Sequence, residues 1–596
     1  MGAKCSCHGV SSLHDVSEAV VIKEMNSEKI APLENAASVL VPFVPQRVAK
    51  AFAASSFNDE ATGDLLFPTR PRLKEAALLL VDVKGFTNLS EKYAKQGTEG
   101  IEKFSLWISS IFTRMIQIIG KYNGDIDCFA GDAFLVIFES ERSGSLRAPV
   151  GRSFRESADI AGSVEGEHGE AFSSPALRTS IEFAICCAQD IAQELDDNKL
   201  GLTIHAALSA GWTCAVEAGG EATPRSEAFL LGKPLFELGR AMPMAGTSEM
   251  VVCQSALGAL SGTLKGEWRG DGYLCMALLP EAGMENRLRA PAASKKAADD
   301  TVRKSVDSVV KHALAISQLQ KLQMTERMRL GDLQHRRASD GGMAKHPAKQ
   351  SDPLSSLQSL LRFVPWVVRL RCMAGWQMDM LAENREVSIL FVTGKFETEE
   401  ISSGLIQRLQ GCVAKMIDVA NGEFDGLTRQ VTVDDKGLAA IFVYGAAGFI
   451  PKSHALQCLS AAKKLFSCVL QGQRDVRFTA GLASGNCYCG LVGSPEIRCE
   501  YAVMGDTVNT AARLAGAAHK MGRPIICAES LRAALEQDDV DASALKPAGT
   551  VSLKGKTEEM PIYVPSHGHQ LRAMSRRKSL MSAVHGREEE LARLFE

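Results

Sequence analysis

The chain has 596 residues, of which 45% are hydrophobic, and this is enough for several cores of ordinary size. Its 67 basic and 70 acidic residues give a net charge of −3, which excludes the global positive footprint of a nucleic-acid-binding protein. No apolar run reaches the roughly 18 residues that span a bilayer. The 16 cysteines lack the paired CxxC spacing of a zinc site, which indicates reduced thiols in an intracellular protein.

The N-terminus begins MGAKCS, in which Gly2 and a serine four positions later form the pattern for N-myristoylation. One myristoyl chain binds a membrane only marginally, so Cys5 and Cys7 are expected palmitoylation sites that supply a second anchor. The alternative is an unmodified, disordered start. We therefore expect residues 1–39 to be a disordered segment that anchors a cytoplasmic protein to the cytosolic face of a membrane.

An internal repeat organises the rest of the chain, because the segment from Leu73 to Pro280 recurs in degraded form from Glu386 to Pro565. Each copy follows the same short lead, Phe-Val-Pro, at residues 43–45 and 363–365. The expected organisation is a first domain at 40–290 with a disordered insertion at about 140–175, a charged linker at 291–355, a second domain at 356–566 and a tail at 567–596.

The two copies predict the same elements in the same order. An apolar strand (76–83 and 387–394) precedes a helix of period 3.6 (104–122 and 406–420), then a hairpin that starts at Gly124 or Gly426. The hairpin turns are expected at residues 131–132 and 434–435. A second helix, a strand (208–212 and 482–486) and a glycine-led element (232–240 and 505–513) follow. This irregular alternation predicts an α+β fold, a mixed sheet covered by helices.

Two aspartates of the first copy are candidate metal ligands. Asp82 closes the first strand and Asp132 lies at the hairpin turn, and magnesium needs few protein carboxylates because phosphate and water complete its shell. The loop Val83-Lys84-Gly85-Phe86-Thr87 that follows can direct backbone amides and a hydroxyl at phosphates. Aspartates at strand ends are common in proteins, so this signal is weak when taken alone.

The second copy supplies a different pair, Asn509 and Arg513, four residues apart on one face of an expected helix. That face can address a ribose and an α-phosphate, since the guanidinium fork matches phosphoryl oxygens as charge develops. An ordinary solvated helix face is the alternative. The four residues are specific only in combination and in this order.

These segments are identified as similar to a known family. FAGDAFLVIF after DVKGFT resembles the metal-binding half of class III adenylyl and guanylyl cyclases, and CEYAVMGDTVNTAARL resembles their transition-state half. AENREVSILFV and GLASGNCYCGLVG resemble the second catalytic domain of the bicarbonate-responsive soluble adenylyl cyclases. The resemblance implies two tandem domains that pair head to tail as an intramolecular pseudo-dimer. It implies one site with two Mg²⁺ or Mn²⁺ ions at Asp82, Asp132 and Val83, opposite Asn509 and Arg513.

The same comparison makes the other interface site degenerate. Thr393 stands where Asp82 does, and Phe236 stands where Asn509 does. In the resembling enzymes this pocket accepts bicarbonate through a lysine and an arginine. Here the lysine position is Cys128, which leaves only Arg240 for that role.

The resemblance also marks residues that contact the nucleotide. The adenine-reading lysine and its partner correspond to Gln430 and Ala502; a glutamine satisfies either purine edge and an alanine neither. His205 occupies the position of a basic residue that faces the triphosphate, with a neutral core histidine as the alternative. Lys554 and Lys556 match a phosphate-facing loop, with ordinary turn lysines as the alternative.

The expected function is an adenylyl cyclase that converts ATP to 3′,5′-cyclic AMP and pyrophosphate. A guanylyl or relaxed purine cyclase that also takes GTP, and an inactive membrane-tethered scaffold or nucleotide sensor, remain as alternatives. The tail resembles the start of an ATPase module. Ser339 in RRAS and Ser579 in RRKSL fit basophilic kinase sites and suggest feedback from a cyclic-nucleotide-dependent kinase, unless these are plain basic linkers.

Overall fold

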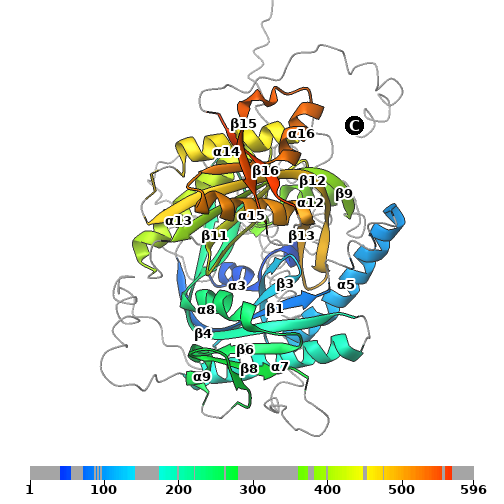
Figure 1. The fold of residues 1–596 in the computed structure, drawn as a ribbon. Helices are drawn as coiled ribbons and strands as arrows, with labels where there is room; N and C mark the ends of the chain where they lie inside the picture. The colour runs from blue at the N-terminus through cyan, green and yellow to red at the C-terminus, as the bar shows by residue number, and fades with distance from the viewer. Residues whose placement is uncertain are drawn as a thin grey trace, which may run out of the picture.

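A computed structural model describes the chain over these residues: 40–55, 71–85, 89, 93, 97–140, 174–197, 201–220, 222–260, 264–279, 360–373, 382–396, 401–446, 453–470, 472–473, 475–553 and 558–566. The expected N-terminal segment, most of the insertion, the linker and the tail lie outside these ranges. Two sheets with their covering helices stack on each other, the first blue to green and the second yellow to red (Figure 1).

The first domain follows the lead η1 (Val41–Phe43) and α3 (Gln46–Ser55). It consists of β1 (Arg72–Lys84), α5 (Gly97–Lys121), β2 (Asp125–Ala130), β3 (Ala133–Glu139), α7 (Pro175–Asp197), β4 (Thr203–Gly219), β5 (Ser226–Leu231), α8 (Lys233–Ala241), η2 (Met242–Met244), β6 (Glu249–Cys253), α9 (Gln254–Ala259), β7 (Glu267–Trp268) and β8 (Tyr273–Ala277).

The second domain follows the lead α12 (Trp366–Met373). It consists of β9 (Glu383–Phe396), α13 (Ser403–Ile417), η4 (Asp418–Glu423), β10 (Leu427–Asp434), β11 (Gly437–Tyr444), α14 (His454–Cys468), β12 (Val476–Ser494), β13 (Arg498–Met504), α15 (Asp506–Lys520), β14 (Ile525–Ala528), α16 (Glu529–Gln537), η5 (Ala542–Ala544), β15 (Leu545–Val551) and β16 (Met560–Pro565).

The two sheets have the same strand order. Within the described residues the first reads β2-β3-β1-β4-β6-β8-β7 and the second β10-β11-β9-β12-β14-β16-β15, with β5 and β13 paired to the long strands β4 and β12. Only the β4–β6 and β12–β14 pairs are parallel among the described ladders, so both sheets are mixed. The expected α+β fold with two similar helix-covered sheets is therefore confirmed.

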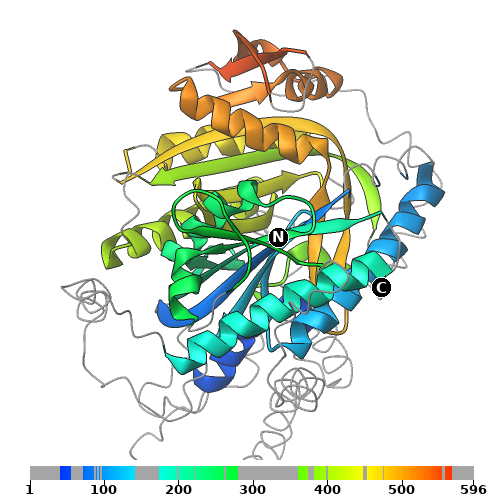
Figure 2. The same cartoon turned by 60° about the horizontal axis from the view of Figure 1, so that its bottom comes forward.

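Alternation along β1 explains how its two faces are used. Ala77, Leu79 and Val81 pack beneath α5 and α7, which lie side by side over one face of the sheet (Figure 2), whereas Ala76 and Leu78 pack on the face of α8. Since successive strand residues point to opposite faces, Asp82 shares the α8 side. These apolar residues of β1 are therefore buried on both faces of the sheet. Asp82 lies near the polar end of the strand.

Each long strand crosses to the other domain. Val216, on the far half of β4, joins the apolar cluster under α13 of the second domain, and Val492, on the far half of β12, joins the cluster under α5 of the first. Gln410 of α13 donates a 2.9 Å hydrogen bond to the carbonyl of Glu217. The domains thus pair head to tail, each covering the other's hairpin arm.

One expected turn is displaced. The first hairpin turns at residues 131–132, as expected, but β10 continues through Asp434, which pairs with Gly437, so the second turn lies at residues 435–436. Asp434 Oδ1 accepts the backbone N–H of Lys436 at 2.8 Å, and Gly437 has a φ of +107°. The side-chain acceptor and the glycine favour a tight turn one residue later than the sequence comparison predicts.

Candidate active site

Asp82 and Asp132 lie close together at the end of β1. Asp82 pairs across the ladder with Ala133, the residue next to Asp132, and Val83 donates a backbone hydrogen bond of 3.3 Å to the carbonyl of Asp132. Burial and the negative charge of Asp82 raise the pKa of Asp132 to about 6. Two carboxylates that repel each other in a half-buried setting fit the donor set of a divalent cation site.

His205 faces the same point from β4. It pairs with Asp82 across the β1–β4 ladder, and its Nε2 lies 3.2 Å from Asp82 Oδ2. Burial lowers the pKa of His205, against the opposing effect of Asp82. At this distance His205 is placed to orient the Asp82 carboxylate, while its expected contact with a triphosphate stays a prediction.

The loop after β1 is described only as far as Gly85. This residue has a φ of +94°, a left-handed conformation that favours glycine, and a Cβ there would lie 3.2 Å from Leu202 Cδ2. Phe86 and Thr87 lie outside the described residues. The backbone at Gly85 is suited to the close approach of a phosphate.

Asn509 and Arg513 both lie on α15, as the spacing predicts. Asn509 is exposed and Arg513 is half-buried, while Ala511, Leu514 and Ala515 fix the opposite face of the helix in the core. α15 begins after Gly505, which follows β13 directly. The helix therefore presents two polar side chains from a rigid support.

The second domain carries different residues on the equivalent rungs. Thr393 pairs with Thr479 where Asp82 pairs with His205, and their hydroxyl oxygens are 2.9 Å apart. The retained carboxylate of Asp434 is engaged in its own turn, and burial raises its pKa. Two hydroxyls and a turn-bound carboxylate replace the donor set of the first domain.

Aromatic side chains fill this second site. Phe236, the counterpart of Asn509, is 3% exposed and joins the apolar cluster of the second domain. Its ring lies 6.2 Å from that of Phe396 in an edge-on arrangement. Phe396 is the last residue of β9, where the first domain has Gly85 directly after β1. Two packed rings therefore take the place of a glycine and of the counterpart of Asn509 on this side of the interface.

The expected base-reading residues are both buried, in different surroundings. Gln430 is 7% exposed, and its Nε2 has no hydrogen-bond partner among the described residues. Ala502 is packed in the apolar cluster that contains α5 of the first domain. An orphaned amide beside an apolar wall leaves one polar group for recognition of a base.

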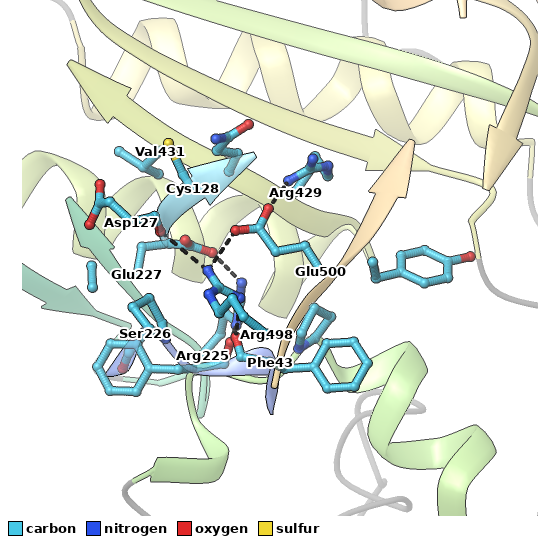
Figure 3. Close-up of a pocket in the computed structure, with 16 residues that line it drawn as sticks. Phe43, Asp127, Cys128, Arg225, Ser226, Glu227, Arg429, Val431, Arg498 and Glu500 are labelled. Carbon is cyan, nitrogen blue, oxygen red and sulfur yellow. Dashed lines mark hydrogen bonds and ion pairs between the residues drawn. The ribbon is translucent and has the colours of Figure 1, made fainter. Parts of the chain in front are cut away.

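A small cavity of about 50 Å³ lies between the domains beside Gln430. Its lining includes the Phe43 and Phe363 leads and three arginines with their carboxylate partners, shown as dashed contacts (Figure 3). Arg225 Nε is a second buried donor without a hydrogen-bond partner in the described part of the chain. A space of this size holds a few water molecules that accept from such donors.

Cys128 and Arg240, the expected remnants of a regulatory pocket, have different environments. Cys128 is buried in the lining of the cavity, and burial raises the pKa of its thiol well above its usual value. Arg240 is exposed on α8, and its Nε donates to the carbonyl of Phe236 at 3.3 Å. The arginine is thus bound to the backbone of its own helix, one turn before it.

The remaining expected residues lie outside the described ranges, namely Gly2, Cys5, Cys7, Ser339, Lys554, Lys556 and Ser579. Within the described part of the chain, no group of three or more His, Cys, Asp or Glu side chains is arranged for a metal ion. None of the helices in these ranges combines the length and the hydropathy of a membrane span.

Sequence reasoning missed two buried ion pairs at the interface, Arg225–Glu227 and Arg498–Glu500. Their signal was present in the repeat, because each copy has Arg-x-Glu seven residues before the glycine that precedes α8 or α15. A repeated charge pattern within an apolar strand predicts buried pairing, since an unpaired buried charge is costly.

Comparison with known proteins agrees with this arrangement. Residues 403–566 match the family described as adenylate and guanylate cyclase catalytic domain. The chain is 24% identical over 460 residues to adenylate cyclase type 10 of Rattus norvegicus, covering 75% of this chain and 24% of that protein. It is 30% identical over 115 residues to adenylate cyclase 1 of Rhizobium meliloti (strain 1021), covering 18% of this chain and 16% of that protein.

Among solved structures, a class III adenylyl cyclase-like ATP-binding protein from Pseudomonas aeruginosa has a TM-score of 0.44 at 13% identity, covering 82% of this chain and 92% of that chain. The chain spans about a quarter of the length of the adenylate cyclase type 10 proteins. The similarity to those proteins extends over 75% of the chain, well beyond the second domain, so the chain is related to adenylate cyclase type 10, and its residues 403–566 match the adenylate and guanylate cyclase catalytic domain family.

Proposed function

We propose that the chain is a cyclase that converts ATP to 3′,5′-cyclic AMP and pyrophosphate at one of its two interface sites. The observation that carries this proposal is that Asp82 and Asp132 lie close together. Burial and the charge of Asp82 raise the pKa of Asp132 to about 6. Such a pair is unfavourable by itself and is stabilised by divalent cations. In the second domain Thr393 takes the place of Asp82, and its hydroxyl contacts that of Thr479.

The residues divide the reaction between the domains. The ribose 3′-oxygen attacks the α-phosphorus in line, the bond to the β-phosphate oxygen breaks, and pyrophosphate leaves. In our proposal Asn509 orients the ribose and Arg513 stabilises the charge on the α-phosphate. Asp82, Asp132 and Val83 would hold two Mg²⁺ or Mn²⁺ ions. When bound, these ions would neutralise the triphosphate and activate the 3′-hydroxyl. His205 orients Asp82 for that role.

The substrate base is proposed to be adenine, with guanine as the second candidate because of Gln430. Its buried amide pairs with the edge of either purine, and Ala502 adds no polar contact. Comparison of kcat/KM for ATP and GTP separates a strict adenylyl cyclase from a relaxed enzyme.

The test of activity uses the purified chain with ATP or GTP and either Mg²⁺ or Mn²⁺. Cyclic nucleotide formation should require the metal and should fall by at least about 1000-fold in Asp132→Asn, because one metal carboxylate is lost. Equal, background-level formation by the wild type and Asp132→Asn would instead support a nucleotide sensor or scaffold.

We also propose that the N-terminus is acylated at Gly2 and at Cys5 or Cys7, and that Ser339 and Ser579 are phosphorylated by a basophilic kinase. These proposals rest on the sequence motifs. Labelling with a myristate analogue should mark the wild type and not Gly2→Ala. Phosphate incorporation lost in Ser339→Ala or Ser579→Ala tests the kinase sites.

A further inference from the structure

The side chain of Arg498 joins the second domain to the strand that leads to Asp132. Arg498 lies on β13 and is 2% exposed. Its Nε donates to the carbonyl of Ile126 at 3.1 Å and its Nη2 to that of Asp127 at 3.2 Å, both on β2 of the first domain. Its Nη1 donates to the carbonyl of Phe43 at 3.3 Å, in the lead. One guanidinium therefore binds backbone acceptors both on β2 and in the lead.

The carbonyls that Arg498 contacts lie at an irregular point of β2. The β2–β3 register shifts between Ile126 and Cys128, which is a bulge at Asp127. The same residue is held by Arg47 of the lead, whose Nε lies 2.6 Å from Asp127 Oδ1. A bulge bends its strand and redirects the residues beyond it. The hairpin turn that carries Asp132 lies directly beyond, so the bulge sets its direction.

The ion pairs of Arg498 extend to the strands that carry the expected base-reading residues. Glu500 accepts from Arg498 at 2.8 Å and from Arg429 at 3.0 Å (Figure 3). Arg429 precedes Gln430 and donates to the carbonyl of Phe129 on β2 at 3.2 Å. The chain Arg498–Glu500–Arg429 thus connects the metal-bearing hairpin to the strands that carry the base-reading residues.

The pseudo-symmetric position provides a built-in comparison. Arg225, which directly precedes β5, pairs with Glu227, as Arg498 pairs with Glu500. It donates to the carbonyls of Arg362, at 3.3 Å, and Phe363 in the second lead. Arg225 is also buried and lines the same cavity as Arg498, but its backbone acceptors lie in the second lead and, among the described residues, none lies on β2. The two arginines are similar in burial and ion pairing and differ in whether they bind the strand that leads to Asp132.

We propose that Arg498 is a positioning residue for the reaction, which fixes the β2 bulge so that Asp132 is held beside Asp82. The inference rests on the proposed function and goes beyond it, because the residue touches neither nucleotide nor metal. Only arginine meets the requirement, since its planar fork donates in several fixed directions, whereas a lysine ammonium is a point charge that cannot reach the three carbonyls and Glu500 together.

The experiment compares Arg498→Lys with the matched variant Arg225→Lys in the full chain. Both keep the charge and lose one guanidinium at the interface, so thermal unfolding should shift by a similar amount. Arg498→Lys should lower kcat at least tenfold and raise the Mn²⁺ concentration for half-saturation severalfold, with little change in the KM for ATP. Arg225→Lys should keep kcat and Mn²⁺ affinity within about twofold of the wild type.

Electron paramagnetic resonance of Mn²⁺ binding, with a non-hydrolysable ATP analogue present, gives a readout that does not need turnover. Weaker Mn²⁺ binding in Arg498→Lys alone supports the proposal even if the wild type forms no cyclic nucleotide, which would refute the proposed function only. If both variants lose Mn²⁺ affinity equally, in proportion to their loss of stability, the proposed positioning role of Arg498 is overturned. If Arg498→Lys does not fold, Glu500→Gln, which keeps a hydrogen-bond acceptor without the charge, must weaken Mn²⁺ binding relative to Glu227→Gln.

Discussion

Asp82 and His205 face each other across the β1–β4 ladder, with Nε2 3.2 Å from Oδ2. The second domain has Thr393 and Thr479 on the same rungs, with hydroxyl oxygens 2.9 Å apart. The two domains therefore share the backbone arrangement of this ladder but not the side chains on it. A carboxylate oriented by a neutral histidine is a ready cation ligand, whereas two hydroxyls satisfy each other. Equivalent rungs of one ladder therefore carry different side-chain chemistry in the two domains.

Asp132 should destabilise the metal-free fold at neutral pH. Its folded pKa is about 6 against an ordinary value of 3.8, so the folded state binds more protons, and stability falls as pH rises through this window. Above pH 6 in EDTA, the free energy of unfolding of Asp132→Asn should therefore exceed that of the wild type by about 1–3 kcal/mol. The variant should unfold at a higher temperature. The difference should vanish below about pH 4.

Thermal unfolding across pH checks this prediction, with Asp196→Asn, an exposed residue on α7, as the control for loss of one aspartate. Added Mn²⁺ and nucleotide should reverse the order, because only the wild type has both carboxylates. A variant that is less stable than the wild type at pH 7 without metal would contradict the repulsion between Asp82 and Asp132.

His205→Thr copies the residue that the second domain has on the same rung. Loss of the Nε2–H donor leaves Asp82 free to turn, so the Mn²⁺ concentration for half-maximal activity should rise severalfold while the KM for ATP changes little. Thr479→Ser is the control in the degenerate site and should leave both values unchanged. An unaltered metal requirement in His205→Thr would mean that the ladder contact has no positioning role.

Phe236→Asn restores the counterpart of Asn509 without restoring a second site. The substitution removes a buried ring and buries an amide, which should lower the free energy of unfolding by about 3–5 kcal/mol. Thr393 and Phe396 remain, so equilibrium dialysis with an ATP analogue should still find one nucleotide per chain. Phe236→Leu should be milder in urea unfolding. Two bound nucleotides in Phe236→Asn would show that the closure alone separates the two sites.

Gln430→Glu should change base preference. A carboxylate only accepts, so it suits the N1–H and N2 donors of guanine and disfavours the N1 acceptor of adenine, and Arg429 is a neighbouring cation. The ratio of kcat/KM for GTP to that for ATP should rise about tenfold or more. Gln430→Leu is the matched control, in which both substrates should lose activity together. An unchanged ratio in Gln430→Glu would remove Gln430 from base recognition.

The repeat made much of the fold predictable before any coordinates. Two copies with the same order of apolar strands, period-3.6 helices and glycine-led turns predict two similar sheets, and both have the same strand order. The helix that carries Asn509 and Arg513 followed from spacing alone. These features depend on local periodicity and turn chemistry, which a sequence states directly.

Other features depended on contacts between distant segments. The leads at residues 43–45 and 363–365 were visible as a repeat, but their carbonyls are held by Arg498 and Arg225, each from the opposite domain. The repeat aligns Asp434 with Asp132, but the carboxylate of Asp434 accepts a hydrogen bond within its own turn.

The sequence by itself determined the reaction class that the residues favour, the two tandem domains and the inequality of their sites, because motif identity and periodicity are properties of short segments. Only the tertiary structure decided that Asp82 and Asp132 are close enough to repel, that the rings of Phe236 and Phe396 pack together, and that Arg498 contacts the β2 bulge. Charge repulsion, ring packing and a guanidinium that reaches across domains are all set by distances between residues far apart in the chain, and these distances exist only after the two domains pair.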